Sequence, residues 1–274
     1  MRYGLIGYGS MGSAVTLALL GDGSLREQDI VVYNRTPARL EGLKRDHPGV
    51  AIASSPAEAA RKADAVFVCV HSHSVPEVVD EIREALTANT HLLVLNGGVR
   101  IDDLARYHDG PISKVIPSIT LATGRGIILM THGAAVPVER ARSLEALFSR
   151  SSRVMVVPEE QLEAATDLTS CGPGLLAEMM AEFARTGARA GGLEFREAMD
   201  MVAETMLGTA LMLAGGTTPS ELKCRVATRG GITEQGIAVL ENELPPTFER
   251  MFEATRRKRE TVRASLDSEP GRGR

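Results

Sequence analysis

The sequence has no tryptophan and only six phenylalanines and four tyrosines among its 274 residues. Surfaces that bind single-stranded nucleic acid stack their ligands on aromatic side chains, so this scarcity argues against that class and against an aromatic-lined sugar site. The 31 basic and 35 acidic side chains give a formal charge of -4, which offers no general attraction for nucleic acid or anionic membranes. Every apolar run is shorter than the roughly 18 residues of a membrane helix. We expect neither a nucleic-acid partner nor a membrane partner.

Cysteine is also scarce. The three cysteines, Cys69, Cys171 and Cys224, are odd in number and far apart, which disfavours a disulfide framework and a four-ligand zinc site. We therefore expect no metal and a reducing compartment. The first twenty residues do not resemble a signal peptide, because glycines interrupt the hydrophobic stretch at positions 4, 7, 9 and 12. These features predict a cytoplasmic protein.

Residues 1–157 alternate short β-branched runs with amphipathic stretches. Strands are predicted at 2–6, 30–33, 50–53, 65–70, 91–95, 114–116, 127–130 and 153–157, and helices at 11–20, 37–45, 56–62, 76–86, 101–107 and 137–148. This alternation predicts right-handed βαβ units, and the continuous apolar strands indicate a sheet that is covered on both faces. We expect an α/β protein whose N-terminal domain, 1–157, has a Rossmann-type, doubly wound, mostly parallel sheet.

The composition changes after Pro158, where Glu, Ala, Leu, Met and Arg predominate. Helical periodicity is found at 159–169, 175–190, 195–213 and 235–266, and Pro245-Pro246 predicts a kink in the last helix. The stretch 195–213 is apolar on more than one face, and a single helical layer of this length cannot bury it. We therefore predict an all-helical dimerisation domain, 158–266, that forms a homodimer, with higher oligomers left open. The polar tail, 267–274, is predicted to be disordered.

A glycine-rich turn lies between the first predicted strand and helix, with the sequence Gly-Tyr-Gly-Ser-Met-Gly from position 7 to 12. The first glycine permits the tight turn, the second lets the backbone approach a pyrophosphate, and the third allows close packing of helix and strand. The helix N-terminus then presents free N–H groups to the phosphates. The candidate cofactor-binding residues here are Gly7, Gly9, Ser10, Met11 and Gly12.

The end of the second strand indicates which dinucleotide binds. NAD-dependent enzymes usually carry an acidic residue there to hold the ribose 2′-hydroxyl, whereas this strand is followed by Asn34, Arg35 and Thr36. Arg35 can pair with a 2′-phosphate, and the other two side chains can donate hydrogen bonds to it. We therefore expect NADPH rather than NADH. Val70 and His71, at the end of the fourth strand, are placed near the nicotinamide.

Two glycine-bearing segments interrupt the helical half, at 170–174 and 227–233. Glycine and proline are costly within helices, so both segments need an explanation. The second segment precedes a helix, and the N–H groups of Gly231, Ile232 and Thr233 can form a small anion-binding cup. A simple turn between two helices explains the same sequence equally well.

Together, the glycine turn, the Asn-Arg-Thr sequence, the Gly-Pro break and the Gly-Gly-x-Thr loop resemble the pyrroline-5-carboxylate reductase family, over all but about the last ten residues. That family combines an NAD(P)H-binding Rossmann domain with an interlocked helical dimer. Its glycine loop holds the substrate carboxylate, and the loop threonine lies near the ring nitrogen. The resemblance implies that Thr233 is catalytic and that the small-molecule substrate is bound by Thr228, Gly230, Gly231, Ile232, Cys171 and Gly172.

The implied reaction is the NADPH-dependent reduction of a cyclic imine carboxylate, pyrroline-5-carboxylate, to proline in proline biosynthesis. The chain departs from the family pattern in four places: 228–229 replace Ser-Pro, 232–233 replace paired threonines, 71–72 replace Lys-Pro, and 116–120 replace Met-Pro-Asn-Thr-Pro. The combination of Ile-Pro-Ser-Ile-Thr at 116–120, Ser-Cys-Gly-Pro at 170–173 and Gly-Gly-Ile-Thr at 230–233 is more similar to the late-competence-operon (ComER-type) paralogues of the reductase. Two alternatives therefore stay open, a reductase of a related imine and a non-catalytic dinucleotide-binding regulatory paralogue. A β-hydroxyacid dehydrogenase is disfavoured, because 172–192 contains no lysine.

Overall fold

The computed structural model describes residues 1–267 and divides into two compact units. Among the described residues, one unit contains Met1–Gly172 and 256–267, and the other contains Pro173–Thr255. The domain boundary expected at 157/158 stays a prediction. The last strand ends at Val156, and the compact units divide between Gly172 and Pro173. The predicted disordered tail lies outside the described residues, except for Asp267, which ends a helix.

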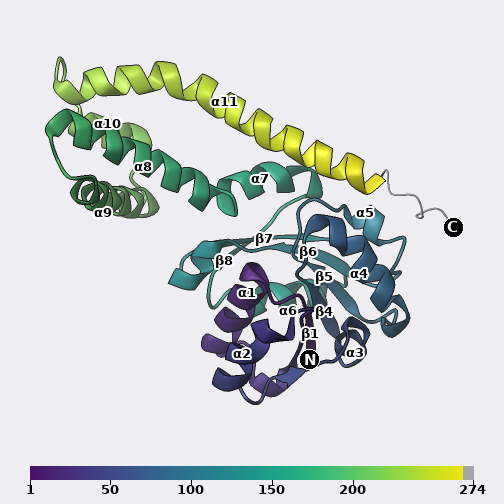
Figure 1. Ribbon diagram of the computed structural model, residues 1–274. Coiled ribbons are helices and arrows are strands. Elements are labelled where there is room, and N and C mark those ends of the chain that lie inside the picture. Colours follow the sequence, from purple (N-terminus) through teal and green to yellow (C-terminus); the bar gives the residue numbers. More distant parts are fainter. Residues whose placement is uncertain (268–274) are drawn as a thin grey trace. The chain divides into compact units, whose positions relative to one another are not determined.

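The first unit is built on an eight-stranded sheet (Figure 1), with the strand order β3-β2-β1-β4-β5-β6-β7-β8. Its strands are β1 (Tyr3–Ile6), β2 (Ile30–Tyr33), β3 (Ala51–Ile52), β4 (Ala65–Val68), β5 (His91–Val94), β6 (Ile112–Ile116), β7 (Ile127–His132) and β8 (Arg153–Val156). Strands β1 to β6 are parallel, β7 pairs antiparallel with β6, and β8 runs parallel to β7. The order reverses between β1 and β4, which is where doubly wound sheets bind their ligands.

Helices cover both faces of the sheet (Figure 1). Alternate strand side chains such as Leu5 and Phe67 pack with α1 (Ser10–Gly21), α2 (Glu41–Asp46) and α6 (Val138–Phe148). The intervening side chains, such as Ile6 and Val66, pack with α3 (Pro56–Arg61), α4 (Val75–Ile82) and α5 (Ile101–Leu104). Burial on both faces explains the continuous apolar strands. Short 3-10 helices are η1 (Glu27–Asp29), η2 (Pro37–Leu40), η3 (Ser72–Ser74), η4 (Arg83–Ala85), η5 (Ile119–Thr123) and η6 (Glu159–Gln161).

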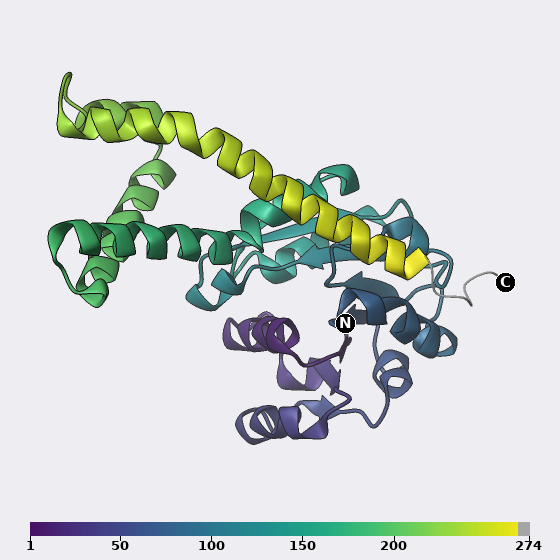
Figure 2. The same ribbon diagram turned by 45° about the horizontal axis from the view of Figure 1, so that its top comes forward.

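The rest of the described chain is helical (Figure 2), with α7 (Leu162–Thr169), α8 (Gly172–Gly191), α9 (Phe195–Ala214), α10 (Pro219–Val226) and α11 (Ile232–Asp267). The predicted architecture, a Rossmann-type sheet followed by a helical region, is confirmed. Helix α10 was not predicted, although a capping box between Thr218 and Glu221 marks its start. Helix α11 begins earlier than expected and continues through Pro245 and Pro246.

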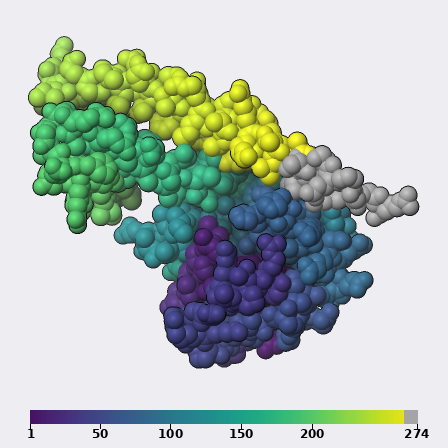
Figure 3. Space-filling model, viewed as in Figure 1, coloured from purple at the N-terminus to yellow at the C-terminus, as the bar shows by residue number. Residues whose placement is uncertain are grey.

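The last turns of α11 belong to the sheet-containing unit, and the space-filling view shows them in yellow against it (Figure 3). Val262 packs on the core that lies beneath α3 and α4. Arg259 pairs with both carboxylate oxygens of Asp167, a residue of α7 whose side chain is only 2 % exposed. The end of the chain is therefore fixed to this unit by apolar packing and by a largely buried ion pair.

Two negative findings concern the described residues, 1–267. No helix in this range combines the length and the hydropathy that crossing a bilayer requires. The same range contains no group of three acidic, histidine or cysteine side chains arranged to hold a metal ion. All three cysteines are free thiols.

Candidate functional site

The glycine turn links β1 to α1 in the geometry that its sequence predicts. Gly7 has φ +101°, and a Cβ built on it lies closer than 3 Å to the Cys69 carbonyl. A Cβ on Gly12 lies closer than 3 Å to the Gly7 carbonyl, so neither position has room for a side chain. The helix begins at Ser10 with Gly9 as its cap and no acidic residue in its first turn. Its first amides lack acceptors within the helix, as a phosphate-binding turn requires.

Asn34 holds the end of β2 against this turn. Its Oδ1 accepts a hydrogen bond from the Tyr8 amide at 2.8 Å, and its Nδ2 donates to the Thr36 carbonyl at 2.8 Å. Arg35 and Thr36 follow on the exposed surface. Arg39, in η2, was not predicted as a site residue; its Nη1 lies 3.8 Å from the Cβ position of Gly9. Arg39 therefore places positive charge at the turn, and Arg35 follows β2 four residues earlier in the chain.

The loops that follow β4 and β5 meet at the same edge of the sheet. Val70 packs against the turn, with its Cγ1 3.1 Å from the Cβ position of Gly7. His71 is exposed, and its ring stacks on His73 with centroids 5.8 Å apart. Ser72 exchanges hydrogen bonds with Asn96, the residue that follows Leu95 after β5. The predicted cofactor residues thus come together at the carboxyl ends of β1, β2 and β4.

The Gly-Pro segment breaks the chain between α7 and α8, and it is fixed to the loop after β6. Ser170 Oγ donates to the Pro117 carbonyl at 2.9 Å, and Ser118 Oγ donates to the Thr169 carbonyl at 3.1 Å. Cys171 as a whole is exposed, but its thiol is partly desolvated. This desolvation and the nearby Asp167 carboxylate raise the pKa of the thiol. The thiol therefore stays protonated near neutral pH, which argues against a nucleophilic role.

The second glycine segment joins α10 to α11. Gly230 has φ +72°, and its amide donates to Glu234 Oε2 at 2.7 Å. The Gly231 amide, which we expected in an anion cup, donates to the Thr228 carbonyl at 2.8 Å. Ile232 and Thr233 are the first residues of α11, and their amides occupy positions without an acceptor in the helix. The cup is therefore reduced to these two amides, and the Ile232 side chain is 94 % exposed.

An open hollow of about 460 Å³ lies elsewhere on the sheet-containing unit. Residues that include Ile101, His132 and Val157 line it, and none of the predicted site residues does. Its walls are mostly apolar, and no residue of the glycine turn is among those that line it.

Comparison with known proteins decides the family. Residues 159–262 match the family described as pyrroline-5-carboxylate reductase dimerisation, and residues 2–96 match the family described as NADP oxidoreductase coenzyme F420-dependent. The chain is 35% identical to pyrroline-5-carboxylate reductase 3 of Bacillus subtilis over 95% of its own length and 96% of that protein's. The chain belongs to the pyrroline-5-carboxylate reductase family. Its N-terminal unit is accordingly an NADP-binding oxidoreductase domain, and its helical region is a dimerisation domain.

Two other comparisons place the chain within this reductase family. It is 28% identical to the pyrroline-5-carboxylate reductase of Escherichia coli over 88% of its own length and 90% of that protein's. It is 23% identical to the ComE operon protein 4 of Bacillus subtilis, over 95% of this chain and 96% of that protein. The family resemblance predicted from the sequence is confirmed, but identity is higher to the reductase than to the competence-operon protein.

Solved structures of reductases share the fold. The structure of a pyrroline-5-carboxylate reductase from Coxiella burnetii has a TM-score of 0.85 at 24% identity, covering 95% of this chain and 98% of that one. The Plasmodium falciparum pyrroline carboxylate reductase, described with NADP bound, has a TM-score of 0.84 at 22% identity, covering 96% and 98%. At these identities the similarity establishes the fold.

Proposed function

We propose that this chain reduces pyrroline-5-carboxylate to proline with NADPH, the reaction that gives its family its name. The observation that carries the proposal is the combination of a sterically intact phosphate turn, in which Gly7 and Gly12 have no room for a Cβ, with an exposed Gly-Gly-Ile-Thr loop at the start of α11. The 35% identity to a reductase across almost the whole chain supports it.

The decisive experiment follows NADPH oxidation by the purified protein with pyrroline-5-carboxylate near neutral pH. Turnover that is faster with NADPH than with NADH is the expected result. Tight NADPH binding without turnover would contradict the proposal and favour a cofactor-binding regulatory paralogue or a reductase of another imine. The exposed Ile232 in place of a threonine is the feature that favours these alternatives.

The first turn of α1, with Arg39 beside it and Arg35 after β2, fits a phosphorylated dinucleotide. The amides of Ser10, Met11 and Gly12 can bind the pyrophosphate, and Arg35 can bind the 2′-phosphate. When bound, the reduced nicotinamide supplies a hydride to the imine carbon. Because β2 is followed by no carboxylate before Glu41, nothing at this strand end repels a 2′-phosphate. These features support NADPH over NADH.

Replacing Arg35 by alanine is expected to raise the KM for NADPH about tenfold or more and to leave the KM for NADH nearly unchanged. The reason is that a charge-assisted hydrogen bond contributes about 1.5–3 kcal/mol, and only NADPH has the 2′-phosphate. Steady-state kinetics with both cofactors measure the change. Arg45→Ala is the matched control, because Arg45 is exposed on α2 and already pairs with Asp46. An equal rise in the KM for NADPH and for NADH would contradict the assignment of Arg35 to the 2′-phosphate.

The α11 loop is the proposed substrate site. The amides of Ile232 and Thr233 bind the substrate carboxylate, and the helix dipole favours an anion at this position. The Thr233 hydroxyl donates a hydrogen bond to the ring nitrogen as that nitrogen gains electron density, with water as the final proton source. Thr228 and Gly230 shape the turn, and Cys171 and Gly172 contribute the break between α7 and α8.

Thr233→Ala is expected to lower kcat/KM for pyrroline-5-carboxylate about a hundredfold, because the developing amine loses its donor. The Kd for NADPH should not change, since the cofactor residues belong to the sheet-containing unit. Thr233→Ser keeps the hydroxyl and should retain most of the activity. Equal activity of the alanine variant and the wild type would remove Thr233 from the mechanism.

The helical region supports a homodimer. Large apolar side chains are exposed on α8 and α9 of the single chain, among them Phe183 (65 %), Met201 (57 %) and Leu207 (53 %). The buried core of this unit is small and consists of Ala184, Ala188, Ala198 and Val202. An apolar surface of this kind usually marks an interface. Oligomers beyond the dimer, and the cytoplasmic location expected from three free thiols, stay predictions.

Phe183→Glu is expected to convert dimers into monomers of 29.3 kDa, because a carboxylate in an apolar interface loses its hydration. Sedimentation equilibrium measures the mass. Val138→Glu is the matched control, since Val138 is equally exposed (63 %) but lies on α6 of the sheet-containing unit. A wild-type monomer, or dissociation caused by the control alone, would contradict this interface.

A further inference from the structure

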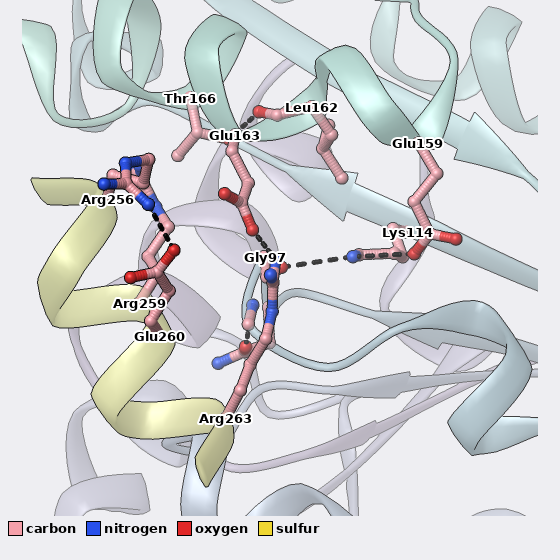
Figure 4. A network of polar contacts seen from close by, with 12 residues as sticks. Gly97, Lys114, Glu159, Leu162, Glu163, Thr166, Arg256, Arg259, Glu260 and Arg263 are labelled. Carbon is pink, nitrogen blue, oxygen red and sulfur yellow. Dashed lines mark hydrogen bonds and ion pairs between the residues drawn. The ribbon is translucent and has the colours of Figure 1, made fainter. Parts of the chain in front are cut away.

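A lysine is buried inside the sheet-containing unit. Lys114, on β6, has a side chain that is only 3 % exposed. Burial lowers its pKa, and the Glu159 carboxylate opposes this shift. The ammonium donates to Glu159 Oε1 at 3.0 Å and to the Gly97 carbonyl at 3.1 Å (Figure 4). Because desolvation of a buried ion pair can cost more than the attraction between its charges gains, packing alone does not explain a lysine at this position.

The Gly97–Gly98 peptide is held at both of its polar ends. Lys114 binds the carbonyl oxygen of this peptide, and the Gly98 amide donates to Asn96 Oδ1 at 2.7 Å. A Cβ on Gly98 would lie 3.2 Å from both Asn96 Oδ1 and Ser72 Oγ, so a side chain at this position would crowd the hydrogen-bonded pair. Without the ammonium, only one end of the peptide plane keeps its partner.

This peptide lies in the loop that follows β5, at the edge of the sheet where the cofactor residues come together. Strand β5 is adjacent to β4, and β4 is adjacent to β1, which carries the glycine turn. The Asn96–Ser72 pair joins the β5 loop to the loop after β4, which contains the candidate nicotinamide residues Val70 and His71. Lys114 contacts this loop at the Gly97 carbonyl and is held by Glu159 from η6.

Glu159 fixes the ammonium from the opposite side. Its Oε1 accepts hydrogen bonds from Lys114 and from the Ile101 amide at 3.0 Å, which ties η6 to the start of α5. The carboxylate is 24 % exposed, so it can balance the lysine charge while staying partly hydrated. The chain Glu159, Lys114, Gly97 therefore connects the segment after β8 to the cofactor edge of the sheet.

We propose that Lys114 is a positioning residue for the nicotinamide half of the cofactor, acting by holding the Gly97–Gly98 peptide plane through the Gly97 carbonyl. This inference rests on the proposed NADPH-binding function. Lys114 touches neither the glycine turn nor the arginines that follow β2. Removal of the Lys114 ammonium should therefore weaken the binding of the nicotinamide half and leave the binding of the adenosine half unchanged.

The test is the double variant Lys114→Met/Glu159→Gln, which removes both charges and preserves the shapes of the side chains. NADPH and adenosine 2′,5′-bisphosphate, which lacks the nicotinamide, are titrated by calorimetry. We expect the Kd for NADPH to rise about tenfold and kcat to fall at least tenfold, because a small misplacement of the reacting groups is costly. The Kd for the bisphosphate should stay within twofold of the wild-type value.

A direct readout comes from amide hydrogen exchange in the protein without cofactor. The segment 95–99 should exchange faster in the double variant, while the glycine turn, 7–12, keeps its wild-type protection. Lys62→Met is the control for loss of a lysine ammonium, because Lys62 is 49 % exposed and pairs with Glu58 of α3. It should leave both affinities and the exchange of 95–99 unchanged.

Two results would overturn the proposal and leave Lys114 with a structural role only. One is an equal rise in the Kd of NADPH and of the bisphosphate. The other is a lowered melting temperature with unchanged NADPH affinity and kcat. Failure of the proposed function would look different, because the wild-type protein itself would not oxidise NADPH with pyrroline-5-carboxylate. In that case the two titrations and the exchange measurement still decide the role of Lys114. A wild-type protein that does not bind NADPH would overturn both proposals together.

Discussion

Gly9→Ala is expected to raise the Kd for NADPH about a hundredfold while the protein stays folded. Gly9 has φ -87° and ψ -165°, which alanine adopts without strain, and its Cβ position has only Arg39 Nη1 within 4 Å, at 3.8 Å. The methyl group therefore fits the cofactor-free protein, but it occupies the space through which the second glycine lets a pyrophosphate approach. The expected loss corresponds to about 3 kcal/mol of binding free energy.

Gly12→Ala should lose stability as well as binding. Its Cβ would lie closer than 3 Å to the Gly7 carbonyl and 3.3 Å from Cys69 Cβ, so α1 has to move away from β1. Overpacking of this kind costs about 1–3 kcal/mol of unfolding free energy. The contrast between the two glycines separates a position reserved for a ligand from a position reserved for the protein's own backbone.

Calorimetric titration and thermal unfolding measure the two effects on the same preparations. Gly21→Ala is the control, because Gly21 ends α1 with no atom within 4 Å of its Cβ position. It should keep the wild-type Kd and an equal or slightly higher melting temperature, since alanine favours a helix. Wild-type NADPH affinity in Gly9→Ala would contradict the assignment of this turn to the cofactor.

Arg259→Met is expected to lower the free energy of unfolding by about 3 kcal/mol or more, the range found when one partner of a buried ion pair is removed. Asp167 is 2 % exposed on its side chain and Arg259 is 19 % exposed. The hydrogen bond between them raises the pKa of Arg259, so the guanidinium remains charged. Its loss removes the bidentate cationic partner of a buried carboxylate, so the negative charge is less well compensated.

Urea unfolding measures this effect, and two further variants interpret it. Arg26→Met removes the same bidentate contact, with Asp29, from an arginine that is 72 % exposed, and should leave the unfolding midpoint nearly unchanged. The double variant Asp167→Asn/Arg259→Met should recover part of the lost stability, because it also removes the buried negative charge. Equal effects of Arg259→Met and Arg26→Met would show that burial does not set the strength of the pair.

Much of the fold and part of the candidate site follow from local sequence patterns. Strands β1 and β2 coincide with the predicted ones to within one residue, and the turn at Gly7 and Gly12 has the close contacts that its sequence requires. Such patterns are readable because they depend on neighbouring residues: a strand buried on both faces is continuously apolar, and a tight turn needs glycine. The Gly231 amide was misplaced because its acceptor depends on how the turn closes, not on the residue types.

The sequence by itself determined the fold class and the tight geometry of the glycine turn, and it predicts a preference for a 2′-phosphate, because each depends on residues that are close together in the chain. Only the tertiary structure decided that β7 runs antiparallel to β6, that Lys114 meets Glu159, and that Arg259 meets Asp167. These ion pairs join residues 45 and 92 positions apart. No local periodicity encodes such partners, because a charged residue has the same sequence signature whether it is hydrated at the surface or buried against its counterion.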